Sequence, residues 1–277
     1  MDRNAFSNGL IVAKDTDVSL ERSSYRLLDT WVNALTQTDL NSLIEDIIGA
    51  ECRCVVANHN LHSLYVYHHD RKMRRFYAAA DYIHVDGMSM VALGRLCGLP
   101  LERSHRVTYA DWIYSIMSEA ARNRWRVFYL GSKPGVAEKG ASLLRQQYPG
   151  LQIETTHGYF DAWQESDENR AVVEKINRYR PHILMVGMSM PRQEHWILDN
   201  LQQLDANVVL PSGAAIDYVA GSVPTPPRWA GRWGLEWLFR LLAEPGRLGQ
   251  RYLVEPWFIL RLLLLRAVVR SGKRALP

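Results

Sequence analysis

Apolar residues along the chain recur in two periods, one typical of strands and the other of helices. Short apolar runs predict strands at 52–57, 82–85, 125–130, 151–155, 183–186 and 207–210. Apolar residues at three- and four-residue spacing predict helices at 25–51, 61–80, 88–97, 109–123, 136–148, 166–180 and 192–204. Because strands alternate with helices, we expect an α/β protein built on a mostly parallel, doubly wound sheet.

The prolines of Pro224-Thr-Pro-Pro227 break this pattern and predict a domain boundary. We expect a core at 1–227, with an irregular lead-in at 1–24, and a helical appendage at 228–277. The appendage carries a net charge of +7 within a chain of net +4. This asymmetry predicts an anionic partner for the appendage, either lipid or phosphate.

The segment Trp257–Arg270 is strongly apolar but is interrupted by Arg261 and Arg266. A membrane-spanning helix needs about 20 consecutive apolar residues, so an interfacial helix on an anionic membrane surface fits better. The alternative is a helix that docks on the core or on another subunit. Three cysteines and no apolar leader favour a reduced, cytoplasmic protein.

Polar residues follow several predicted strands, at the edge of an open α/β sheet where ligands bind. Asp86 is either a general base for a hydroxyl group or a helix cap. Asn58 and Asn60, in an expected turn, either hold sugar hydroxyls or make local turn hydrogen bonds.

Two further turns have the same ambiguity. The turn that begins at Gly131 either offers backbone N–H groups to an anion or uses glycine for steric reasons. Gln193 and Glu194, expected at the mouth of a turn, either bind a ligand or merely occupy the first turn of a helix.

Common nucleotide and catalytic motifs are missing: there is no Walker loop, no G-x-G-x-x-G and no G-x-S-x-G. Asp15-Thr-Asp17 matches the D-x-D of metal-dependent glycosyltransferases, but it precedes every predicted strand of the sheet. We therefore predict no metal and no cofactor.

Several segments, in this order, resemble the WecG/TagA/CpsF family of glycosyltransferases over about residues 55–252. They are Val85-Asp86-Gly87, Tyr129-Leu-Gly-Ser-Lys-Pro-Gly135, His157-Gly-Tyr-Phe160, Pro191-Arg-Gln-Glu-His-Trp196, Gly234-Leu-Glu-Trp-Leu-Phe-Arg240, Glu244-Pro-Gly-Arg247 and Arg251-Tyr252. The Gln-Glu turn combined with the last three segments is specific. Tyr109 departs from the family pattern, which usually has glycine there, and Asn58 stands where threonine is often found.

The resemblance implies a Rossmann-like sheet with a C-terminal appendage, and an inverting transfer that needs no metal. It implies that Asp86 deprotonates the acceptor hydroxyl and that Gln193 and Glu194 hold the donor. Three appendage residues would neutralise the leaving diphosphate, namely Arg240, Arg247 and Arg251. At the strand ends, we expect Asn58 to be catalytic as well. We expect three more residues to bind substrate, namely Asn60, Arg106 and Gly131.

The substrates implied are a UDP-sugar donor and an undecaprenyl-diphosphate-linked sugar acceptor, at the cytoplasmic face of the inner membrane, in the biosynthesis of exopolysaccharide or another surface polysaccharide. The transferred sugar is left open between glucose, added to lipid-linked glucose, and N-acetylmannosamine or its uronic acid. No nucleic-acid partner is expected, and a homo-oligomer is left open. Two alternatives remain: a nucleotide-dependent oxidoreductase on the same architecture, and a non-catalytic membrane-associated scaffold.

Overall fold

The computed structural model of the chain describes residues 23–223, 236–243 and 245–274, with only some of the side chains in the last two ranges. The Asp15-Thr-Asp17 motif, most of the expected lead-in and the proline boundary at 224–227 lie outside the described residues.

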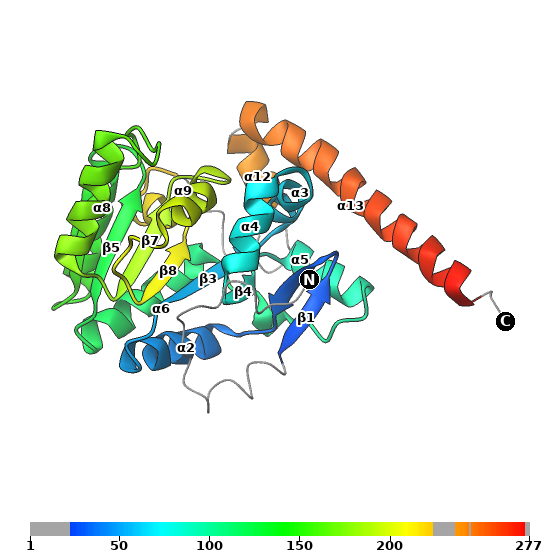
Figure 1. The fold of residues 1–277 in the computed structure, drawn as a ribbon, viewed down its shortest axis with the longest axis horizontal. Coiled ribbons are helices and arrows are strands. Elements are labelled where there is room, and N and C mark those ends of the chain that lie inside the picture. Colours follow the sequence, from blue (N-terminus) through cyan, green and yellow to red (C-terminus); the bar gives the residue numbers. More distant parts are fainter. Residues whose placement is uncertain (1–22, 224–235, 244, 275–277) are drawn as a thin grey trace.

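A six-stranded parallel sheet forms the centre of the molecule, in the order β4-β3-β8-β7-β5-β6 (Figure 1). Its strands are β3 (Cys54–His59), β4 (Tyr82–Val85), β5 (Arg126–Gly131), β6 (Gln152–Thr156), β7 (Ile183–Gly187) and β8 (Val208–Pro211). All six predicted strands are present, and the prediction of a parallel, Rossmann-like α/β fold is confirmed.

Helices cover both faces of this sheet, because its strands bury side chains on both sides. Alternate residues of β5 show this: Val127 and Tyr129 belong to one hydrophobic core, and Phe128 and Leu130 to the other. The first core is shared with α2 (Gln37–Gly49), α6 (Tyr109–Arg122), α7 (Val136–Gln147) and α10 (Ala215–Ala220). The second core is shared with α4 (Arg71–Ala79), α8 (Asp167–Tyr179) and α9 (Arg192–Asn200).

Residues 24–33 form an antiparallel hairpin of β1 (Ser24–Leu27) and β2 (Thr30–Asn33), so the helix predicted from residue 25 was wrong over its first part. Leu28 and Asp29 make the two-residue turn with positive φ angles of 44° and 68°. The helix begins only after Thr36, whose side chain forms a capping box with Asp39. The buried leucines of the hairpin imitate helical spacing in the sequence.

Two smaller differences concern the region around β3. The helix predicted over 61–80 is two helices, α3 (Leu61–His69) and α4, because the Asp70 side chain accepts hydrogen bonds from Lys72 and Met73 N–H and caps α4. The turn predicted at 58–60 was also wrong in part, since Asn58 and His59 continue strand β3. A short helix α5 (Met88–Leu96) and the 3₁₀ turn η2 (Arg103–His105) follow β4.

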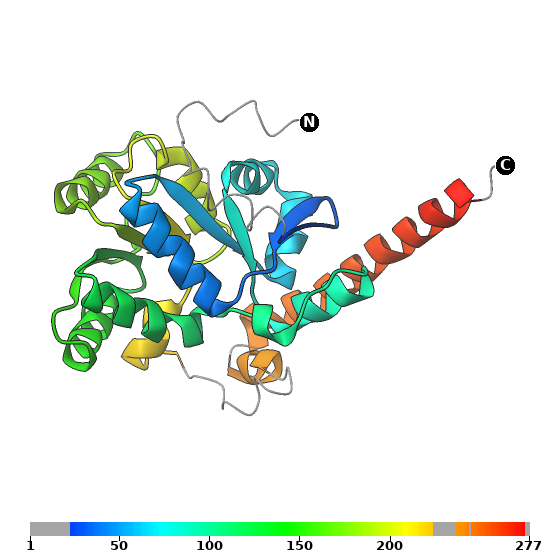
Figure 2. The same ribbon diagram turned by 90° about the horizontal axis from the view of Figure 1, so that it is seen from below.

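The appendage contains α12 (Glu236–Ala243) and a long helix, α13 (Pro245–Arg274). Figures 1 and 2 show α13 running past the edge of the core, so that its C-terminal end projects away from the other elements. Its first half packs on α3 through Ile259, which is 5% exposed, and through Phe258 against Tyr65 and His69. None of the helices in the described part of the chain is both long and apolar enough to cross a bilayer.

Candidate active site

Asp86 and the two asparagines of the predicted turn meet at the carboxyl edge of the sheet. Strands β3 and β4 are parallel neighbours, and Asn58 pairs in register with His84, two residues before Asp86. The Nδ2 groups of Asn58 and Asn60 each lie 3.4 Å from Asp86 Oδ2 and donate to it. The sequence predicted these residues one by one, and the fold brings them together.

The orientation of Asn60 is fixed by its second task. Its Oδ1 accepts a hydrogen bond of 2.9 Å from the Ser63 N–H and so caps α3, which leaves its Nδ2 to face Asp86. Between the two asparagines, the buried His59 ring bonds to Thr30 Oγ1 at 2.9 Å and to Ser63 Oγ at 2.8 Å. The hairpin and α3 therefore hold this segment from both sides.

Helix α5 does not use Asp86 as its N-cap. The cap position is Gly87, where no side-chain hydrogen bond forms. Asp86 therefore precedes the cap position by one residue.

Arg106 lies beside the same strand end, because it forms a parallel bridge with Val85. Its guanidinium pairs with Asp111 at 3.3 Å, and the side chain is 14% exposed. Gly131, at the end of β5, is explained by packing: an added Cβ would lie 2.2 Å from the Gly187 carbonyl oxygen. The close approach of these two backbones accounts for glycine at this position without any ligand.

Gln193 and Glu194 are buried in the first turn of α9, with exposures of 3% and 0%, and do not line an open turn. Gln193 Nε2 donates to Glu194 Oε1 at 2.8 Å, and Gln193 Oε1 accepts from the Gly213 N–H at 3.2 Å. Glu194 Oε2 has no hydrogen-bond partner among the described residues. Burial raises the pKa of Glu194 from 4.5 to about 7.

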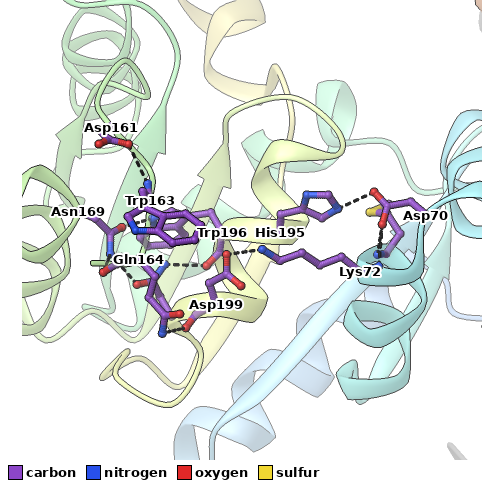
Figure 3. A network of polar contacts seen from close by, with 11 residues as sticks. Asp70, Lys72, Asp161, Trp163, Gln164, Asn169, His195, Trp196 and Asp199 are labelled. Carbon is purple, nitrogen blue, oxygen red and sulfur yellow. Dashed lines mark hydrogen bonds and ion pairs between the residues drawn. The ribbon is translucent and has the colours of Figure 1, made fainter. Parts of the chain in front are cut away.

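The outer side of α9 is tied to α4 by polar contacts, drawn in Figure 3. His195 Nε2 lies 2.8 Å from Asp70 Oδ2, and Lys72 Nζ pairs with Asp199. A groove of about 520 Å³ runs along this side, bordered by Phe160, Trp163 and other residues of α4, α9 and the loop before α8. These contacts join the β3–β4 half of the molecule to α9 and so hold Glu194 in place.

Two buried tyrosines complete the surroundings of the carboxylates, and sequence analysis did not place them in the site. Burial first, and then the charges of Glu194 and Asp86, raise the pKa of Tyr77 and of Tyr109 well above the usual value. Both phenols are therefore close enough to the two carboxylates to be affected by them. Tyr109 follows Arg106 by three residues, and that spacing from a predicted site residue was the one available signal.

Arg240, Arg247 and Arg251 belong to α12 and α13, but their side chains lie outside the described part of the structure. Among the side chains that are described, there is no group of three His, Cys, Asp or Glu residues placed to hold a metal ion.

An open parallel sheet with polar side chains converging on its carboxyl edge defines a ligand-binding α/β protein. The sequence matches the model of the glycosyl transferase WecG/TagA/CpsF family over residues 25–273. The chain belongs to this family and is a glycosyltransferase.

Enzymes of Staphylococcus aureus are among its relatives. The protein of strain NCTC 8325 / PS 47 named N-acetylglucosaminyldiphosphoundecaprenol N-acetyl-beta-D-mannosaminyltransferase is 28% identical over 194 residues. The match covers 70% of this chain and 73% of that protein. Proteins of the same name from strains COL and MRSA252 match to the same extent.

Proposed function

We propose that the protein transfers a sugar from a UDP-sugar to an undecaprenyl-diphosphate-linked sugar, with inversion at the anomeric carbon. The names of the relatives support the acceptor, because those enzymes act on an N-acetylglucosaminyldiphosphoundecaprenol. The carboxyl edge of an open α/β sheet supports a nucleotide-linked donor. The product would serve the assembly of an exopolysaccharide or another surface polysaccharide.

The observation that carries the proposal is the Asp86 carboxylate with two amide donors on one oxygen. In the proposed reaction Asp86 takes the proton of the acceptor hydroxyl while that oxygen attacks the anomeric carbon. The bond from this carbon to the UDP oxygen breaks, and UDP leaves with the electron pair. Asn58 and Asn60 act by holding the carboxylate toward the acceptor.

On the donor side, Glu194 is the proposed contact and Gln193 positions it. Both polar ends of Gln193 are already used, by Glu194 and by Gly213, whereas Glu194 Oε2 has no partner among the described residues. We assign Arg106 to the acceptor side because it borders the end of β4. Gly131 would contribute close backbone approach rather than a side-chain contact.

The appendage supplies the remaining parts of the proposal. Arg240, Arg247 and Arg251 would bind the diphosphate as its charge develops, since guanidinium groups pair bidentately with phosphate oxygens. Helix α13 would lie on the anionic cytoplasmic surface of the membrane, as a peripheral anchor. In support, leucines on its far half are exposed, with Leu264 at 59% and Leu265 at 54%.

The test is transfer from a panel of UDP-sugars to synthetic polyprenyl-diphosphate-linked glucose and GlcNAc, with and without EDTA. Asp86→Asn should fold normally and lose at least about a hundredfold in rate, the range expected for loss of a general base. The matched control is Asp205→Asn, a 45% exposed carboxylate just before β8, at the opposite edge of the sheet. Wild-type turnover by the Asp86 variant would remove Asp86 from the mechanism, and loss of turnover in EDTA would refute metal independence.

A further inference from the structure

The hydroxyl group of Tyr109 is buried and has no hydrogen-bond partner among the described residues. Tyr109 is the first residue of α6 and is 6% exposed. Burying a hydroxyl without a partner costs free energy, and native proteins rarely leave one in that state without a reason.

Two other buried tyrosines near the same edge of the sheet provide an internal comparison. Tyr77 Oη donates to the Asn58 carbonyl oxygen at 2.9 Å, and Tyr129 Oη donates to the Gly213 carbonyl oxygen at 2.8 Å. The fold thus satisfies two of these three phenols internally, and Tyr109 is the exception.

The position of the Tyr109 ring is well determined by its neighbours. It packs against His84 with ring centroids 5.8 Å apart and against Trp112 at 5.3 Å. Val107, two residues earlier, donates its N–H to the Val85 carbonyl oxygen at 2.9 Å, so the start of α6 is joined to the strand that carries Asp86. The ring therefore has little freedom to turn its hydroxyl elsewhere.

The hydroxyl lies within the electrostatic reach of both site carboxylates. Burial, followed by Asp86 and Glu194, raises the pKa of Tyr109, so the phenol stays protonated and can act as a donor. In the proposed reaction the transferred hexose lies between these carboxylates, because Asp86 serves the acceptor and Glu194 the donor.

We propose that Tyr109 donates a hydrogen bond to a hydroxyl group of the hexose of the UDP-sugar donor and thereby determines which hexose is accepted. This inference rests on the proposed function. A site built to bond a sugar hydroxyl discriminates against a sugar that lacks it, because its own buried donor is then left without a partner. Tyr109 is in this sense a specificity-determining residue.

The experiment compares Tyr109→Phe with Tyr77→Phe and Tyr129→Phe. Urea unfolding of each variant is measured, together with the affinity and kcat/KM of UDP-hexoses and their monodeoxy analogues. Tyr109→Phe should unfold at the same or a higher urea concentration than the wild type, because it loses no internal hydrogen bond. The other two variants should unfold at lower urea concentrations.

In the activity measurements, Tyr109→Phe should be the most affected of the three variants. Loss of one hydrogen bond to the sugar should lower kcat/KM of Tyr109→Phe by about tenfold. For the wild type, one monodeoxy donor should lower kcat/KM by a similar factor. For Tyr109→Phe, the same donor should leave kcat/KM almost unchanged, as expected for coupled groups in a double-mutant cycle. The Tyr129→Phe control should keep the wild-type order of preference among deoxy donors.

Two results would overturn the inference. A Tyr109→Phe protein that is less stable and keeps the wild-type preferences would mean that the hydroxyl has an internal role. An equally stable variant with wild-type preferences would mean that only water meets the hydroxyl. If the wild type binds and discriminates deoxy donors but transfers nothing to lipid-linked acceptors, the proposed function fails while the Tyr109 inference stands.

Discussion

The buried carboxyl of Glu194 should make the stability of this protein depend on pH. Its side chain is fully buried, and burial raises its pKa from 4.5 to about 7. The folded state therefore binds a proton more tightly than the unfolded state does, and stability falls as pH rises through this interval. The difference between the two pKa values corresponds to about 3 kcal/mol, of which about 2.5 kcal/mol falls between pH 5 and pH 8.

Glu194→Gln removes this dependence and keeps an acceptor for Gln193 Nε2. We compare the free energies of unfolding of the variant and the wild type, measured with urea. The variant minus wild-type difference should be about 2.5 kcal/mol larger at pH 8 than at pH 5. Other titrating groups are shared by the two proteins and cancel in the comparison. Glu165→Gln, at an exposed position, reports the effect of losing a surface carboxylate. The reasoning would be refuted if the unfolding free energies of Glu194→Gln and the wild type differed by the same amount at pH 5 and pH 8.

Three further predictions concern the packing at Gly131, the docking of α13 and the binding of α13 to membranes. Gly131→Ala should lower the free energy of unfolding by at least about 2 kcal/mol in urea titrations, because its Cβ would meet backbone, whereas Gly49→Ala, with nothing within 4 Å, should not. Glu255→Gln should speed hydrogen exchange in α13 and lower transfer, because Glu255 is 5% exposed and lies 2.6 Å from His62 of α3; unchanged exchange would contradict a docking role. Leu264→Ser should weaken sedimentation with anionic vesicles by about tenfold, and Leu143→Ser, a 39% exposed leucine on α7, should leave it unchanged.

The sequence predicted the sheet well because every strand except the edge strand β6 is almost entirely buried and reads as a mostly apolar run. It failed at the hairpin because Leu27, Leu28 and Val32 are core residues whose spacing fits a helix as well as a turn between two strands. The left-handed conformation of Leu28 has no signal in the sequence, since glycine or asparagine would be expected there.

The site was predictable as a set of strand ends but not as a geometry. Asp86, Asn58 and Asn60 could each be found from their position after an apolar run, yet their convergence depends on β3 and β4 being neighbours. The burial of Gln193 could have been predicted, because it shares the inward face of α9 with Trp196, Ile197 and Asn200 at helical spacing. The spacing of Tyr109 from Arg106 was a signal for the site, but the lack of an internal partner for its hydroxyl could not be predicted, because nothing in a sequence marks it.

Helix α3 links the proposed catalytic edge to the appendage through a short connection. Its first turn holds Asn60 against Asp86, and its outer side receives Glu255 and Phe258 of α13. A small molecule wedged into the seam between α3 and α13 would shift this helix and with it the amide of Asn60. Such a compound would inhibit without resembling a sugar, a nucleotide or a lipid, and neither substrate at high concentration would displace it.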